Sequence, residues 1–166
     1  MPGTYEPIAT NTLSSAAASV TFSSISGSYT DLIIVGKLVE DTSGNNNANM
    51  RFNSDSGSNY SVTGIGADDS STFKYQSPNA NGIGVSYGNA NAGRVPEFII
   101  HIMNYANTIT YKSTIGRNGS GASGGWTDAK AGLWRSTAAI STISFHTTNT
   151  DFGVGTKFTI YGIRAA

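Results

Sequence analysis

The sequence predicts an all-β fold, an antiparallel β-sandwich of jelly-roll type that follows an extended N-terminal arm. Short segments with apolar residues at every second position recur along the chain, and clusters of Gly, Asn, Ser and Asp separate them roughly every ten residues. No segment combines the 3.6-residue apolar period of an amphipathic helix with helix caps, which argues against a parallel sheet with crossover helices. We therefore expect about ten short strands in a single domain, residues 19–166, after an arm formed by residues 1–18.

The arm is predicted from the lack of alternation in residues 1–18. This segment contains two prolines, which cannot donate hydrogen bonds to a sheet, and its large apolar side chains are those of Tyr5, Ile8 and Leu13. Such a segment buries too little apolar surface to offset its ordering entropy, so we expect it to be mobile in the free protein. We expect the three side chains to insert into pockets of a neighbour. The alternative is that the arm packs back along its own sandwich.

The alternation begins at Ser19. The most apolar strands are predicted over 31–39 and 95–105, and both have apolar residues on two faces, as in a central strand or a strand covered by a partner. Loops are predicted at 41–47 and at the Gly-rich segment 116–125. Further strands are predicted around 20–22, 50–52, 60–62, 73–75, 83–87, 109–115, 126, 133–134, 143–145 and 158–162.

The charge of the chain argues against nucleic-acid binding. Charged residues make up only 12% of the sequence, and Lys+Arg 10 equals Asp+Glu 10, so there is no surplus of cations to displace counterions from phosphates. Ser, Thr, Asn and Gly supply almost half of the residues. A neutral surface of this kind favours association between proteins. The chain has no cysteine and therefore no disulfide or zinc–thiolate site.

The N-terminal sequence predicts no secretory signal, because MPGTYEP contains neither a basic region nor an apolar core. The longest apolar run, Leu32–Val35, is far shorter than the roughly 20 residues of a membrane-spanning helix. We therefore expect synthesis in the cytoplasm and no membrane partner.

Candidate catalytic residues are few. His101 falls in a predicted strand and His146 directly follows one, and a histidine on a strand is usually a half-buried structural residue. The segment 119–125 fits the patterns of a nucleophile elbow and of a dinucleotide-binding loop, but neither motif has its following helix. Asp68 and Asp69 lack the spacing of a calcium loop, although a weak Ca²⁺ site there stays an alternative. We predict no enzymatic activity, no cofactor and no resident metal.

Trp126 and Trp134 flank an Ala- and Gly-containing segment. Tryptophans at the rim of a sandwich stack on sugars or anchor protein interfaces, whereas in the alternative interpretation both belong to the core. The candidate interface residues are thus Tyr5, Ile8, Leu13, Trp126 and Trp134.

Two stretches of the sequence carry a resemblance to a known class of proteins. The first, Tyr5–Gly36, reads YEPIATNTLSSAAASVTFSSISGSYTDLIIVG, and the second, Asp151–Arg164, reads DFGVGTKFTIYGIR. Together they resemble small β-sandwich virion proteins of tailed bacteriophages, including phages of cyanobacteria. The resemblance covers the first 36 residues and the last part of the chain, and the middle matches no pattern of that class.

The resemblance implies a structural role in the phage particle. We expect a capsid decoration (cement) protein that binds the outer surface of the head and stabilises the shell, with the major capsid protein and further copies of itself, as a homotrimer, for partners. Its location would be the outer surface of the virion. The alternative is a tail or fibre module that binds host-surface glycan, and a glycan-active enzyme is a third hypothesis.

Overall fold

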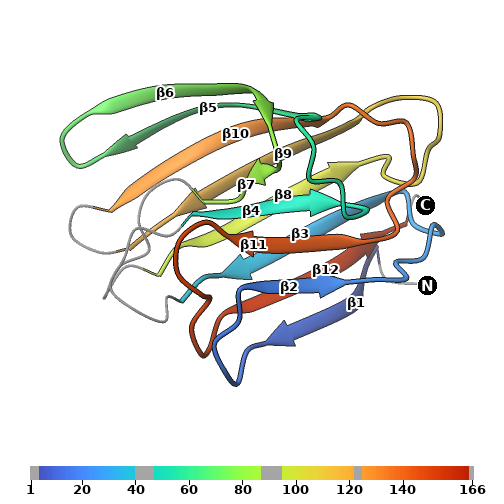
Figure 1. The fold of residues 1–166 in the computed structure, drawn as a ribbon, viewed down its shortest axis with the longest axis horizontal. Coiled ribbons are helices and arrows are strands. Elements are labelled where there is room, and N and C mark those ends of the chain that lie inside the picture. Colours follow the sequence, from blue (N-terminus) through green and yellow to red (C-terminus); the bar gives the residue numbers. More distant parts are fainter. Residues whose placement is uncertain (1–3, 40–46, 87–94, 122–124, 165–166) are drawn as a thin grey trace.

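The computed structural model describes residues 4–39, 47–86, 95–121 and 125–164. Within these ranges the chain forms twelve strands and no helix, in two antiparallel sheets that pack face to face (Figure 1). The predicted all-β antiparallel sandwich is therefore confirmed, whereas the jelly-roll connectivity is not. None of the described residues forms a helix that is long and apolar enough to cross a membrane.

The sheets differ in size. The larger sheet has eight strands in the order β1 (Tyr5–Thr12), β12 (Lys157–Ile163), β3 (Asp31–Lys37), β8 (Glu97–Met103), β9 (Lys112–Gly119), β10 (Trp126–Trp134), β5 (Tyr60–Asp68) and β6 (Thr72–Ala80). The smaller sheet has the order β2 (Ser19–Phe22), β11 (Ile143–Thr147), β4 (Ala48–Phe52) and β7 (Ile83–Gly84). The smaller sheet covers one face of the larger one (Figure 1).

The core lies between the sheets and follows from the alternation in each strand. Ile34 and Ile160 of the larger sheet are fully buried. Phe145 of β11 stacks on Phe158 of β12, with ring centroids 4.2 Å apart and an interplanar angle of 15°. Burying an aromatic side chain in this way stabilises a fold by roughly 1.5–3 kcal/mol, so this pair is a main contact between the two sheets.

Glycines in the larger sheet leave room for aromatic rings. A Cβ atom at Gly36 of β3 would overlap the ring of Phe98, its partner on β8. A Cβ atom at Gly64 of β5 would overlap the ring of Tyr75 on β6. Each ring therefore lies across the backbone of its neighbour, which fixes Phe98 in the core and Tyr75 at the edge of the cavity described below.

The N-terminal segment belongs to the sandwich, so the predicted arm and its boundary at residue 18 are not confirmed. Tyr5–Thr12 pairs with β12 as an edge strand, and the register shifts between Pro7 and Ala9. The prediction failed because a proline is tolerated in an edge strand beside such an irregularity. The backbone N–H of Leu13 donates to Thr156 (2.9 Å), and Ala17 forms a bridge with Phe152, so no helix forms in this segment.

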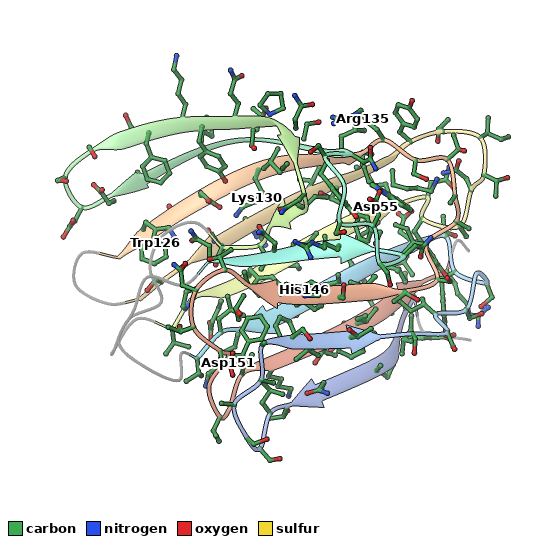
Figure 2. All side chains as sticks on the ribbon, viewed as in Figure 1. Asp55, Trp126, Lys130, Arg135, His146 and Asp151 are labelled. Carbon is green, nitrogen blue, oxygen red and sulfur yellow. The ribbon has the colours of Figure 1, made fainter. Side chains whose placement is uncertain are left out.

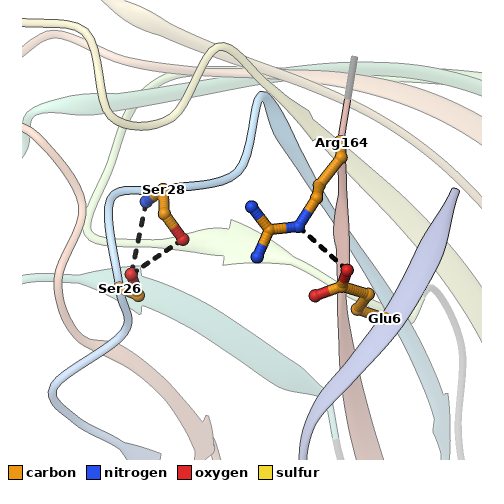
Figure 3. Close-up of polar contacts among 4 residues, drawn as sticks. All are labelled: Glu6, Ser26, Ser28 and Arg164. Carbon is orange, nitrogen blue, oxygen red and sulfur yellow. Dashed lines mark hydrogen bonds and ion pairs between the residues drawn. The ribbon is translucent and has the colours of Figure 1, made fainter. Parts of the chain in front are cut away.

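Side chains also connect the ends of the chain. The Arg164 Nε atom donates to Glu6 Oε1 at 2.9 Å, which joins the strand β1 to the residue that follows β12 (Figure 3). The Arg164 guanidinium lies 4.8 Å from the centroid of the Tyr29 ring. The Ser26 hydroxyl and Ser28 contact each other in the turn before β3 (Figure 3).

The remaining differences concern the lengths of the strands. The hairpin β5–β6 is much longer than the short strands expected at 60–62 and 73–75. The strand β9 extends to Gly119, into the predicted loop 116–125. The predicted loop 41–47 lies outside the described residues except for Asn47.

Candidate functional site

The face of the larger sheet that points away from the smaller sheet carries exposed apolar side chains. Val35 of β3, Ile65 of β5 and Ile115 of β9 are 43%, 66% and 57% exposed. A single exposed apolar side chain needs no explanation, but these three lie on alternate strands of one sheet face and form a patch. This patch is the first candidate site.

The strand registers define this surface, which we call the open face. Ile115 lies opposite His101 and Ala131, Ile65 lies opposite Ala129, and Val35 lies opposite Ile99. Its uncharged members on β3, β8, β9, β10 and β5 are Ile33, Val35, Ile99, Met103, Ser113, Ile115, Gly119, Thr127, Ala129, Ala131, Leu133, Ser61, Thr63, Ile65 and Ala67. The centre of the open face is therefore largely apolar and built from small and β-branched residues.

A groove of about 1320 Å³ crosses the open face over β8, β9, β10, β5 and β6. Its lining includes Ile65 and Ile99, the small residues Ala67 and Ala129, and the two cations Arg117 of β9 and Lys74 of β6. Arg117 lies between Ile99 and Ala129, so charged groups lie among the apolar side chains as well as around them. Among the described strands, the same face carries Lys37, Lys74, Arg117 and Lys157 against Asp31 and Glu97.

His101 lies on the open face beside Asp31. Its Nε2 atom is 2.8 Å from Asp31 Oδ2, and the other oxygen of this carboxylate accepts the backbone N–H of Asn104 at 2.6 Å. The pair thus fixes the turn after β8. His146 lies in the other sheet, 2.8 Å from the hydroxyl of Ser144, and burial lowers its pKa. The fold does not bring the two histidines together.

A polar cluster lies on the opposite face of the same strands, between the two sheets. The Tyr75 hydroxyl donates to Asp128 Oδ2 at 2.9 Å, and the Lys130 ammonium lies 3.3 Å from Asp128 Oδ1. The side chains of Lys130 and Asp128 are only 3% and 0% exposed. Burial lowers the pKa of Lys130, and the neighbouring Asp128 carboxylate acts in the opposite direction. We call Tyr75, Asp128 and Lys130 the polar cluster.

Next to the polar cluster is a cavity of about 460 Å³. Residues of both sheets line it, among them Asn49 of β4, Gly84 of β7, Ser77 of β6 and Lys130 of β10. Lys130, labelled in Figure 2, lies on β10 of the larger sheet. This cavity, which we call the inter-sheet cavity, is the second candidate site.

The structure buries two of the five candidate interface residues. Trp126 and Trp134 are 6% and 3% exposed, in agreement with the alternative of core tryptophans. Ile8 and Leu13 are half-buried and pack against the core, and their contact with a partner stays a prediction. Tyr5 is 60% exposed at the sheet edge and stays open to contact.

The indole of Trp134 has a structural role. Its Nε1 atom donates to Asp55 Oδ2 at 2.7 Å, and this hydrogen bond lowers the pKa of the Asp55 carboxyl. Asn59 donates to the same carboxylate. Trp134 thus ties β10 to the turn before β5.

Serines that follow Asp68 and Asp69 in the same turn donate hydrogen bonds to the Asp68 carboxylate. Asp68 Oδ1 accepts hydrogen bonds from the backbone and the hydroxyl of both Ser70 and Ser71, and these bonds lower its pKa to about 2. Within the ranges that the structure describes, no three His, Cys, Asp or Glu residues are grouped so that they could hold a metal ion. Of the Gly-rich segment with the two motif matches, residues 122–124 lie outside the described part.

Sequence reasoning missed the polar cluster, and of the open face it found only the strands 31–39 and 95–105, which it predicted to be apolar on two faces. One signal could have found the cluster: Trp126, Asp128, Lys130 and Trp134 occupy alternate positions and therefore share one face of a strand. If either tryptophan belongs to the core, the two charges between them do as well. Ile65 and Ile115 gave no such signal, because alternation alone does not tell which face of a sheet is covered.

Comparisons with known proteins identify no relative. No protein-family model matches the chain, and no curated protein matches it in sequence. The functional argument therefore depends on the two candidate sites.

Proposed function

We propose that the protein is a structural component of a tailed-phage particle, a capsid decoration protein that binds the outer surface of the head through the open face. The observation that supports this proposal is the exposed apolar centre of the larger sheet, with Ile65 66% and Ile115 57% exposed. The resemblance of Tyr5–Gly36 and Asp151–Arg164 to phage virion proteins supports the same role.

The size of the open face suits a stable protein interface. Eight strands about 4.8 Å apart and seven residues of about 3.3 Å each give roughly 900 Å². A specific interface of ordinary size buries about 800 Å² on each partner. Docking over most of the open face therefore meets the area that such an interface needs.

The charges of the open face favour a partner with an acidic rim. The chain as a whole has a net charge of zero, but the open face carries four cations and two carboxylates among the described strands. Two open faces packed on each other would bring these cations together. We therefore propose that the open face binds the major capsid protein, and that the homotrimer forms through other surfaces.

The decoration function itself needs no chemistry beyond binding. A protein that binds the assembled shell but not its dissociated subunits stabilises the shell by mass action, by RT ln(1 + [L]/Kd) for each site. The low charge and the many neutral polar residues suit a protein that packs densely on a particle.

The test uses phage heads from which the protein has been removed. Purified protein should bind these heads saturably and should raise the temperature or the osmotic shock at which they release DNA. Binding to host cells without binding to the heads would refute the decoration role and would favour the alternative, a tail or fibre module that binds host-surface glycan.

A further inference from the structure

The lining of the inter-sheet cavity includes a buried ammonium group that has more N–H donors than hydrogen-bond partners. The Lys130 side chain is 3% exposed and has three N–H donors. Asp128 is its sole polar partner among the described residues, at 3.3 Å. Buried donors without acceptors destabilise a protein, so their presence beside a cavity indicates that another molecule supplies the acceptors.

A second buried polar group faces the same cavity. Ser86 is 4% exposed, lines the cavity, and has no hydrogen-bond partner for its hydroxyl within the described part of the chain. Asn49 and Asn81 belong to the same lining. Each amide and each hydroxyl presents donors and acceptors together. The cavity thus offers both kinds of hydrogen-bonding group to a ligand.

The two charged side chains at the cavity, Lys130 and Asp128, favour a neutral ligand. Lys130 would repel a cation, and Asp128 balances Lys130, so an anion gains little net attraction. A purely apolar ligand would leave the buried polar groups unsatisfied. A molecule with several hydroxyl groups satisfies donors and acceptors alike, and the ring of Tyr75 in the lining offers it an apolar face.

We propose that the inter-sheet cavity binds a neutral sugar unit, with the Lys130 ammonium, the Ser86 hydroxyl and the asparagine amides as its hydrogen-bonding groups. The cavity volume of about 460 Å³ lies within the range of small-molecule sites, roughly 300–1,000 Å³. This site is separate from the open face, because Asp128 and Lys130 point to one side of β10 while Ala129 and Ala131 point to the other. Its test is thus independent of the decoration proposal.

The test is an NMR titration of the full chain with four probes: methyl α-D-glucopyranoside, methyl β-D-galactopyranoside, N-acetyl-D-glucosamine and the acidic sugar N-acetylneuraminic acid. At least one of the three neutral sugars should shift the backbone amide signals of Tyr75, Ser86 and Lys130 saturably, with a dissociation constant on the order of 1 mM. The amide signals of Ile65 and Ile115 on the open face should not move.

A matched pair of substitutions on β6 tests the location. Ser77→Trp introduces a bulky ring at the exposed mouth of the cavity and should weaken binding at least about tenfold. Gln76→Trp places the same ring on the other face of the same strand and should leave the affinity unchanged. Both positions are exposed, so both variants should fold.

Three results would overturn the proposal. They are the absence of saturable shifts with every neutral probe up to roughly 50 mM, binding of N-acetylneuraminic acid alone, and equal affinity of the Ser77→Trp and Gln76→Trp variants.

Discussion

Replacing two isoleucines of the open face should weaken binding to phage heads without affecting the fold. In the double variant Ile65→Ser/Ile115→Ser, the side chains that change are 66% and 57% exposed in the free protein. Fully burying an isoleucine is worth about 1.5–3 kcal/mol, so covering these exposed fractions contributes about 1–2 and 0.9–1.7 kcal/mol. The variant should therefore lose about 2–3.5 kcal/mol of binding free energy, or roughly 30- to 300-fold in Kd.

The assay is a sedimentation or mass-photometry titration of heads that lack the protein. Ile109→Ser is the matched control, because Ile109 is 85% exposed but lies in the turn after β8 and not on the open face. The control should bind like the wild type, and all variants should have the same melting temperature within a few degrees. Wild-type affinity of the double variant, or equal weakening of Ile109→Ser, would refute the role of the open face.

Four further predictions concern stability, each measured by thermal or urea unfolding. Gly36→Ala should destabilise the fold by about 1–3 kcal/mol, because its methyl group overlaps an aromatic ring. Deleting residues 1–12 should lower the melting temperature, because it removes an edge strand; an unchanged value would contradict this. The folded-state pKa of Asp55 is lowered, so its carboxylate stabilises the fold above its unfolded pKa, and this stabilisation is lost as the pH falls through the folded pKa. Asp55→Ala should therefore make the free energy of unfolding less dependent on pH in this acidic range. Lys130→Met should cost about 3–5 kcal/mol, whereas Lys130→Met/Asp128→Leu should cost less, because no charge is left buried alone and only the Tyr75 hydroxyl loses its acceptor.

The fold class could be predicted because a period of two is a local property of the sequence. Lys157–Ile163 alternates, Asp31–Lys37 and Glu97–Met103 are short apolar runs bounded by turn residues, and each is a strand in the structure. Tyr5–Thr12 lacks this alternation, and its side chains are exposed or half-buried along its whole length. Its pairing depends on β12, which is distant in sequence, so local patterning contains no sign of it.

The candidate sites were harder to predict for a related reason. Alternation assigns residues to two faces of a strand, but the choice of the covered face depends on where the second sheet packs. In β10 the charged residues Asp128 and Lys130 face inward and Ala129 faces outward, the reverse of the usual pattern. A sequence argument based on hydrophobicity alone therefore places the wrong side of this strand in solvent. The tryptophans at its ends are the residues that correct the assignment.

The two proposals constrain each other through this strand. A partner docked on the open face covers Ala129 and Ala131, whereas the inter-sheet cavity opens beside Ser77 and Asn79 of the edge strand β6. Docking of the larger sheet onto a head therefore leaves the cavity mouth outside the interface. Saturating the cavity with a neutral sugar should then leave the affinity for heads unchanged. A competitive effect would mean that the partner reaches around β6, and that the interface is larger than the open face.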